Sequence, residues 1–162
     1  MASKGTGTHL KGLRELGEAM RLMNSEVSTK IARGAAAAMA GMVKKRAIAL
    51  APQSDAPHQL GRRKDQIAQP GNLKRNIIVK RLPAKQTQLT AEYIVTVRHG
   101  SGKVPNDAFY WRFVEFGTVN MPAQPFLRPA LADNVGPATE AAKKRLASGI
   151  DSAARKASRG QK

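Results

Sequence analysis

The chain has 162 residues and no Cys, which suits one ordinary domain and excludes disulfides and thiolate metal sites. Aromatic residues make up only 4% of it, so we expect a modest core that gains stability by assembly with copies of itself or with partners. Lys and Arg number 28 against 11 Asp and Glu, a net charge of +17 that indicates a polyanionic partner rather than a merely solubilising surface.

Two helices are predicted in the first 50 residues, after a flexible arm at 1–8. Thr8 can cap a short helix whose apolar residues recur at near-helical spacing, namely Leu10, Leu13, Leu16 and Met20. Ser25 can cap a longer helix that runs to about Leu50 and is ended by Pro52. Its apolar stripe consists of Val27, Ile31, Ala35, Met39, Met42, Val43, Ala47 and Leu50.

A basic loop and a β-hairpin are predicted next. Residues 53–70 are polar and broken by Pro and Gly, as in functional or disordered loops, and the cluster Arg62, Arg63 and Lys64 can reach an anion. Residues 73–82 and 91–99 are predicted strands, joined by a loop at 83–90. In the second strand Tyr93, Val95 and Val97 share one face, as in a half-buried strand.

The last third of the chain predicts two more elements. Residues 108–118, "AFYWRFVEFGT", suit a short helix or an edge strand, and we favour the helix. After an interruption at Gly136-Pro137, the spacing of Ala142, Leu146, Ile150 and Ala153 predicts a terminal helix from Ala138, with an outer face of Lys143, Lys144 and Arg145.

These elements predict an α+β fold, in which a long N-terminal helix packs on a small antiparallel sheet and a C-terminal helix closes the domain. The domain covers residues 9–150, and residues 151–162 form a basic C-terminal tail.

Residues suited to catalysis or ligand binding are sparse. His9, His58 and His99 are scattered without metal-ligand spacing, and "HGSGKV" fails as a phosphate loop because Val97 and Val104 replace the required Gly and Ser or Thr. We therefore expect no catalytic residue, no metal and no cofactor. Zinc-finger, basic-zipper and RNA-binding signatures are also missing, which suggests tolerance of DNA rather than reading of its sequence.

Targeting signals are missing as well. The N-terminus lacks the apolar stretch of a secretory signal, and the longest weakly polar run, residues 34–43, is far shorter than the ~20 residues that span a bilayer. We expect a soluble intracellular protein with no membrane partner.

Glu115 lies between Val114 and Phe116, so its carboxylate either points outward or is paired if it is buried. The expected partners are backbone N–H groups or an arginine, and Arg112 and Arg128 are the nearest in sequence.

The stretch "FVEFGT", followed by "MPAQPFLRPAL", resembles the tail-completion (neck, or head-tail joining) protein family of long-tailed double-stranded-DNA bacteriophages, the gene-product-ten-like family of HK-type siphophages. In that family a helix or strand ends in an aromatic-Val-Glu-Phe-Gly-Thr turn, and a loop leads to Pro-Phe-Leu-Arg-Pro-Ala at the last helix. The matching residues are Phe113, Val114, Glu115, Phe116, Gly117, Thr118, Pro122, Pro125, Phe126, Leu127, Arg128, Pro129 and Ala130. "GNLKRNI" at 71–77 is similar to the family's start of the hairpin. The resemblance covers about residues 10–150, and the basic cluster at 62–64 and the Gly136-Pro137 break depart from it.

The resemblance implies a structural virion protein, not an enzyme, that completes the head-proximal end of the tail as a ring of six copies. Its place is the virion neck or tail, and the host bacterial cytoplasm during assembly. The implied partners are copies of itself, other neck and tail proteins (terminator, stopper or connector, tail tube) and, non-specifically, the phage DNA in the channel. A tail terminator ring that caps the tube and a freestanding basic nucleic-acid-binding protein are the alternatives.

Two surface roles follow. The basic residues expected to face acidic neighbours or the DNA passage are Arg62, Arg63, Lys64, Lys74, Arg75, Lys80, Arg81, Lys143, Lys144 and Arg145. Residues 113–131 are rich in large apolar groups and Pro, so we expect them to pack chiefly against the domain's own core and only secondarily against a partner.

Overall fold

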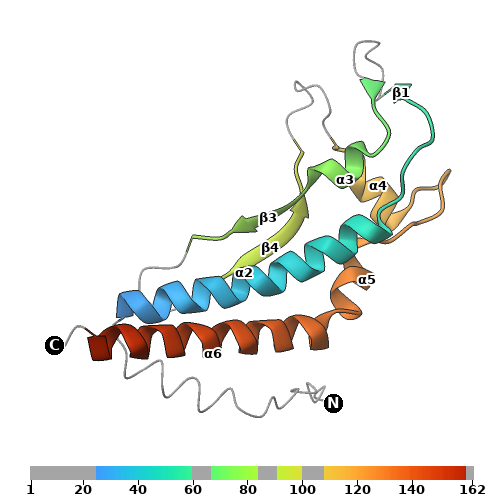
Figure 1. Ribbon diagram of the computed structural model, residues 1–162. Coiled ribbons are helices and arrows are strands. Elements are labelled where there is room, and N and C mark those ends of the chain that lie inside the picture. The colour runs from blue at the N-terminus through green and yellow to red at the C-terminus, as the bar shows by residue number, and fades with distance from the viewer. Residues whose placement is uncertain (1–24, 60–66, 84–90, 100–107, 160–162) are drawn as a thin grey trace.

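The computed structural model describes residues 25–59, 67–83, 91–99 and 108–159 (Figure 1). It confirms the mixed fold, with a long N-terminal helix, a small antiparallel sheet and a C-terminal helix. The predicted helix after Thr8 and the basic cluster Arg62, Arg63 and Lys64 lie outside the described residues. The division into an N-terminal arm, a domain and a C-terminal tail stays a prediction.

Helices α2 (Ser25–Leu50) and α6 (Val135–Arg159) lie side by side and run antiparallel (Figure 1). Small residues let the two axes approach: Ala35 and Ala142 are buried, and a Cβ on Gly149 would stand 2.7 Å from Cγ2 of Ile31. Helix α2 closes with a bond from the Ala51 N–H to the Ala47 carbonyl, directly before Pro52.

Helix α6 begins earlier than the sequence pattern predicted. Gly136 and Pro137 belong to its first turn, where a proline needs no backbone N–H, so they do not interrupt the chain before the helix. The helix also continues past residue 150 to Arg159.

The predicted hairpin is present, but its first strand is shorter than expected. Strand β3 (Ile77–Arg81) pairs antiparallel with β4 (Tyr93–Val97), with Ile77 opposite Val97. Both of these residues are buried at the same end of the ladder.

Residues 73–76, predicted as the start of the first strand, belong instead to the short helix α3 (Asn72–Asn76). Gly71 takes a φ of 75° that turns the chain, and the Asn76 side-chain amide donates to the Asn72 carbonyl at 2.9 Å. These local side-chain and turn effects outweigh the apolar run. Lys74 and Arg75 therefore lie on a helix and not on the sheet.

The predicted loop at 53–70 contains a second, minimal sheet, in which β1 (His58–Gln59) pairs with β2 (Ile67–Ala68). Ala68 is fully buried, which ties this hairpin to the domain.

The core lies where α2 meets the β3–β4 sheet and two short helices, α4 (Trp111–Phe116) and α5 (Leu127–Ala132). Its members are Val43, Ala47, Ala51, Leu73, Ile77, Val97, Ala108, Phe126 and Ala130. Phe126 is the largest fully buried side chain, and alanines fill much of the remainder, so the core is modest as predicted.

The close contact of α2 and α6 can be tested at Gly149. Glycine inside a helix usually costs about 1 kcal/mol relative to alanine, but a Cβ here meets the stiff, β-branched Ile31 side chain at 2.7 Å. We expect Gly149→Ala to lower the free energy of unfolding by about 1–3 kcal/mol.

Gly41 is the matched control, because it is exposed on α2 and a methyl group added there would meet no atom within 4 Å. We expect Gly41→Ala to raise the free energy of unfolding by up to about 1 kcal/mol. Urea unfolding of both variants measures the contrast, and equal effects of the two would refute the packing argument.

Candidate assembly site around Glu115

Helix α4 and the turn before it present two faces with reversed polarity. The inward face carries Ala108, Trp111 and Glu115, and Glu115 is only 1% exposed. The outward face carries Phe109, Arg112, Phe113 and Phe116, and its three phenylalanines are 38%, 51% and 62% exposed. We call this outward set the aromatic face. Both the burial of the acid and the exposure of the phenylalanines therefore need an explanation.

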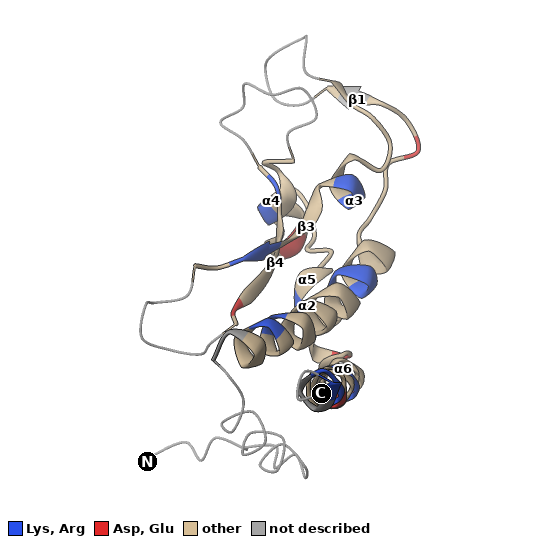
Figure 2. Ribbon diagram, turned by 60° about the vertical axis from the view of Figure 1, so that its left-hand side comes forward, with Lys and Arg blue, Asp and Glu red and all other residues tan. Residues whose placement is uncertain are grey.

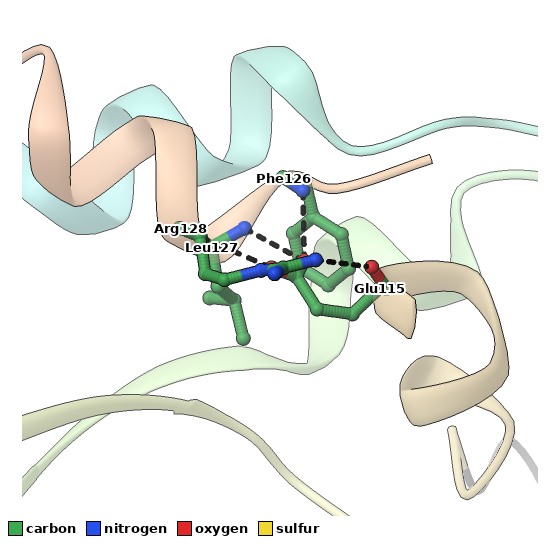
Figure 3. Close-up of polar contacts among 4 residues, drawn as sticks. All are labelled: Glu115, Phe126, Leu127 and Arg128. Carbon is green, nitrogen blue, oxygen red and sulfur yellow. Dashed lines mark hydrogen bonds and ion pairs between the residues drawn. The ribbon is translucent and has the colours of Figure 1, made fainter. Parts of the chain in front are cut away.

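The buried carboxylate of Glu115 caps the N-terminus of α5 (Figure 3). Its Oε2 accepts hydrogen bonds from the backbone N–H groups of Phe126 at 2.8 Å and Leu127 at 3.0 Å, and its Oε1 accepts one from Arg128 at 3.1 Å. The first N–H groups of a helix lack intrahelical partners and carry partial positive charge. The residue at the start of α5 provides no side-chain cap of its own, so Glu115 satisfies these groups from a different helix. We call this arrangement the Glu115 cap.

Arg128 reinforces the cap from its solvent side. Its Nε donates to Glu115 Oε1 at 3.2 Å, and its Nη2 donates to the Glu115 backbone carbonyl at 3.2 Å. The guanidinium also lies 5.0 Å from the ring centroid of Phe116. The expected pairing of Glu115 with backbone N–H groups or an arginine is therefore found, with Arg128 as the arginine. Arg112 lies over the ring of Trp111 instead.

Burial alone raises the pKa of the Glu115 carboxyl, but the hydrogen bonds from Leu127, Phe126 and Arg128 outweigh it, and the pKa lies below its usual value. The cap is therefore a carboxylate at neutral pH. Both of its oxygens already accept hydrogen bonds.

The connector from α4 to α5 turns at Gly117, whose φ of 76° is open to glycine. A Cβ there would stand 2.9 Å from the Ala123 nitrogen, so the close return of the chain also requires glycine. The Thr118 N–H donates to the Met121 carbonyl at 2.8 Å, and the Gln124 N–H donates to the Val114 carbonyl at 2.8 Å. These bonds bring the backbone N–H of Phe126 within hydrogen-bonding distance of the Glu115 carboxylate.

The structure separates the residues of the 113–131 block into two groups. Phe126 and Ala130 are fully buried, as expected for a core anchor. Phe113 and Phe116 are more than half exposed, so these two residues of the block do not pack on the core. Helical geometry explains the difference, because turning Glu115 inward rotates both phenylalanines toward solvent.

The predicted basic residues within the described part lie on three separate elements, α3, β3 and α6 (Figure 2). Several have local partners: Arg75 donates to the Pro70 carbonyl at 3.0 Å, and Lys143 pairs with Glu140 at 2.7 Å. Lys80, Arg81 and Lys144 are exposed. Arg145 is exposed too, and its side chain borders Gly34 of α2.

Sequence reasoning missed one buried polar contact. Asn72 is 2% exposed, and its side-chain amide donates to the Tyr110 hydroxyl at 3.4 Å, which joins α3 to the turn before α4. Burial raises the pKa of Tyr110, although the bond from Asn72 and the charge of Arg75 act against it. The only sequence signal for this contact was the pair Gly71-Asn72, and such a pair is equally typical of an exposed turn.

No group of three His, Asp or Glu side chains in the described ranges could hold a metal ion. None of the helices described is both long and apolar enough to cross a membrane.

Comparison with known proteins gives one match. Residues 15–117, more than half of the chain, match the family described as "Bacteriophage HK97-gp10, putative tail-component". No curated protein and no solved structure matches the chain. The matched range includes α2, the β3–β4 sheet and α4 with Glu115, and it ends at Gly117.

The Glu115 cap predicts a large effect of Glu115→Ala. The change leaves three backbone N–H groups and the Nε of Arg128 without their acceptor, and we expect it to lower the free energy of unfolding by about 3–5 kcal/mol. Glu140→Ala is the control, because it removes a surface ion pair with Lys143 and should cost less than about 1 kcal/mol. Urea unfolding at neutral pH measures both, and a Glu115→Ala cost as small as the control's would contradict the cap.

The cap also predicts how stability depends on pH. Because the folded-state pKa of Glu115 is lowered, its contribution is complete above the usual carboxyl pKa of 4.5 and is lost as pH falls through the folded-state value. We expect the stability advantage of the wild type over Glu115→Gln to shrink between neutral and acid pH. Urea unfolding across that range tests this, and a constant difference would exclude the carboxylate as its source.

Proposed function

The chain belongs to the HK97-gp10-like family of bacteriophage tail components, and we propose that it is the structural protein that completes the head-proximal end of the tail for head–tail joining. In this role the protein works by presenting surfaces to neighbours, and its place is the virion neck or tail. Before incorporation it would be present in the host bacterial cytoplasm.

The observation that carries this proposal is the aromatic face beside the Glu115 cap. Phe113 and Phe116 are more than half exposed, and Val119 in the adjoining turn is fully exposed. Apolar groups gathered in this way on a rigid helix are typical of a surface that a protein partner covers. The Glu115 cap fixes the helix that presents them, so little order has to be gained on binding.

A ring of copies suits this surface. Head-to-tail contacts use two different patches on each copy and close into a ring when the rotation between copies allows it. Six copies is the number that the family resemblance implies. A ring would also explain how a chain with a modest core reaches adequate stability.

The charge of +17 suits a position beside a polyanion. Lys80 and Arg81 at the end of β3 and Lys144 and Arg145 on α6 are exposed on described elements, and we propose that such groups face acidic neighbours or the DNA passage. Contacts of this kind with DNA phosphates do not depend on the base sequence.

We propose no catalytic role. Glu115 is the described acid whose pKa is displaced, and both of its oxygens are engaged in capping α5. A general base needs a free lone pair directed at a substrate.

The test is assembly of phage particles without this protein. We expect full heads and tail tubes of normal length that fail to join, and we expect purified protein to restore joining. Electron microscopy of the lysate counts joined and separate particles.

Other outcomes identify the alternatives. Tubes of uncontrolled length would indicate a tail terminator. Normal particles, together with purified protein whose affinity for duplex DNA falls steeply with salt, would indicate a freestanding nucleic-acid-binding protein. Either result would overturn the proposal.

A further inference from the structure

A groove of about 650 Å³ opens between α2, β4 and α5. Its lining is mostly apolar and includes Met39, Val43, Ile94, Leu127 and Leu131. Ile94 and Leu131 are 43% and 56% exposed, so the hollow is open to solvent. An open apolar hollow of this size lies within the range of about 300–1,000 Å³ typical of binding pockets, so it can accept a cluster of large side chains.

The groove contains one acid, Glu92, directly before β4, and one cation, Arg128, which is already paired with Glu115. Acids are scarce in this chain, with 11 against 28 basic residues. No ion pair joins Glu92 to another residue of the described ranges. A basic residue carried by an apolar partner would therefore find a single, defined counter-charge here.

The aromatic face has the chemistry that this groove would accept. Phe109, Arg112, Phe113 and Phe116 follow the spacing i, i+3, i+4, i+7, by which a helix places its anchors in an apolar groove. Arg112 lies between Phe109 and Phe113 in the sequence, it is exposed, and its guanidinium lies 5.5 Å from the ring centroid of Trp111. The face thus offers apolar anchors and one cation, whereas the groove offers apolar walls and Glu92, the charged group of its lining that has no ion-pair partner among the described residues.

We propose that the aromatic face of one copy docks into the groove of a second copy, with Arg112 opposite Glu92. The inference rests on the proposed function, because it names the contact by which copies join into a ring. The occupant is another copy because this chain carries both halves, complementary in charge and in apolar character.

Within one copy, the aromatic face does not occupy the groove. The Glu115 cap fixes α4 so that Phe113 and Phe116 point to solvent, and Arg128 lies between Phe116 and the groove, which it helps to line. The face and the groove are different surfaces. Each copy can therefore bind one neighbour through its aromatic face and a second neighbour through its groove. Contacts of this type are heterologous and continue from copy to copy until they close.

The first test removes the anchors. We expect Phe113→Ser with Phe116→Ser to weaken self-association by about thirtyfold or more, because buried aromatic anchors dominate interfaces. Mass photometry across a concentration series measures it, alone and with purified tail tubes. Ile67→Ser, which removes another half-exposed apolar side chain outside both surfaces, should leave association unchanged. Thermal unfolding of each variant establishes that the fold persists.

The second test exchanges the charges. Arg112→Glu or Glu92→Arg alone places like charges opposite one another and should weaken association at least about tenfold. The double variant carries the pair in reverse and should recover most of the loss. Such rescue is not expected from general changes in net charge or from local misfolding.

The outcomes separate this inference from the proposed function. If the wild type assembles and neither the serine variants nor the charge exchange alters assembly, the contact is wrong and the tail role stands. If both single variants associate more weakly and the double variant does not recover, the pairing of Arg112 with Glu92 is also wrong. If the wild type never assembles, alone or on tail tubes, both the contact and the ring fail.

Discussion

The structure depends on a carboxylate from one helix that caps the N-terminus of another. Glu115 holds the backbone N–H groups of residues 126–128, and this bond set joins α4 to α5 across the connector. Phe126, which donates one of the bonds, is also the largest buried side chain of the core. The polar cap and the apolar core are therefore anchored at the same residue, and neither can shift without the other.

The cap explains the reversed polarity of α4. Hydrogen bonds to a charged group contribute about 1.5–3 kcal/mol each, whereas leaving a phenylalanine half exposed forgoes about 1 kcal/mol, roughly half of its burial energy. Three backbone bonds and the Arg128 pair thus outweigh two exposed rings. The exposed rings are the consequence, and their rigid placement makes them suitable for contact with a partner. The stability of the fold and the surface proposed for assembly have one common cause.

Much of the fold was predictable because its signals are local. Pro52 ends α2, alternation marks β4, and the chain turns at Gly117 as the Phe-Gly-Thr pattern indicated. Predictions failed where two local preferences competed. The apolar neighbours of residues 73–76 favour a strand, yet the Asn72 and Asn76 side chains stabilise a helical turn there.

The site was predictable only in part. The sequence marked Glu115 as an acid paired with backbone N–H groups or with Arg112 or Arg128, but it could not show that the acid faces inward and the phenylalanines outward. That orientation follows from the position of α5, which lies beyond a connector of irregular structure. The groove could not be predicted either, because α2, β4 and α5 meet only in three dimensions.

Amide hydrogen exchange at Phe126, Leu127 and Arg128 tests the central claim most directly. If the Glu115 carboxylate holds these N–H groups, they exchange as slowly as core amides at neutral pH and become fast in Glu115→Gln, while amides along α2 and α6 keep their protection. Fast exchange at all three positions in the wild-type protein would contradict the account.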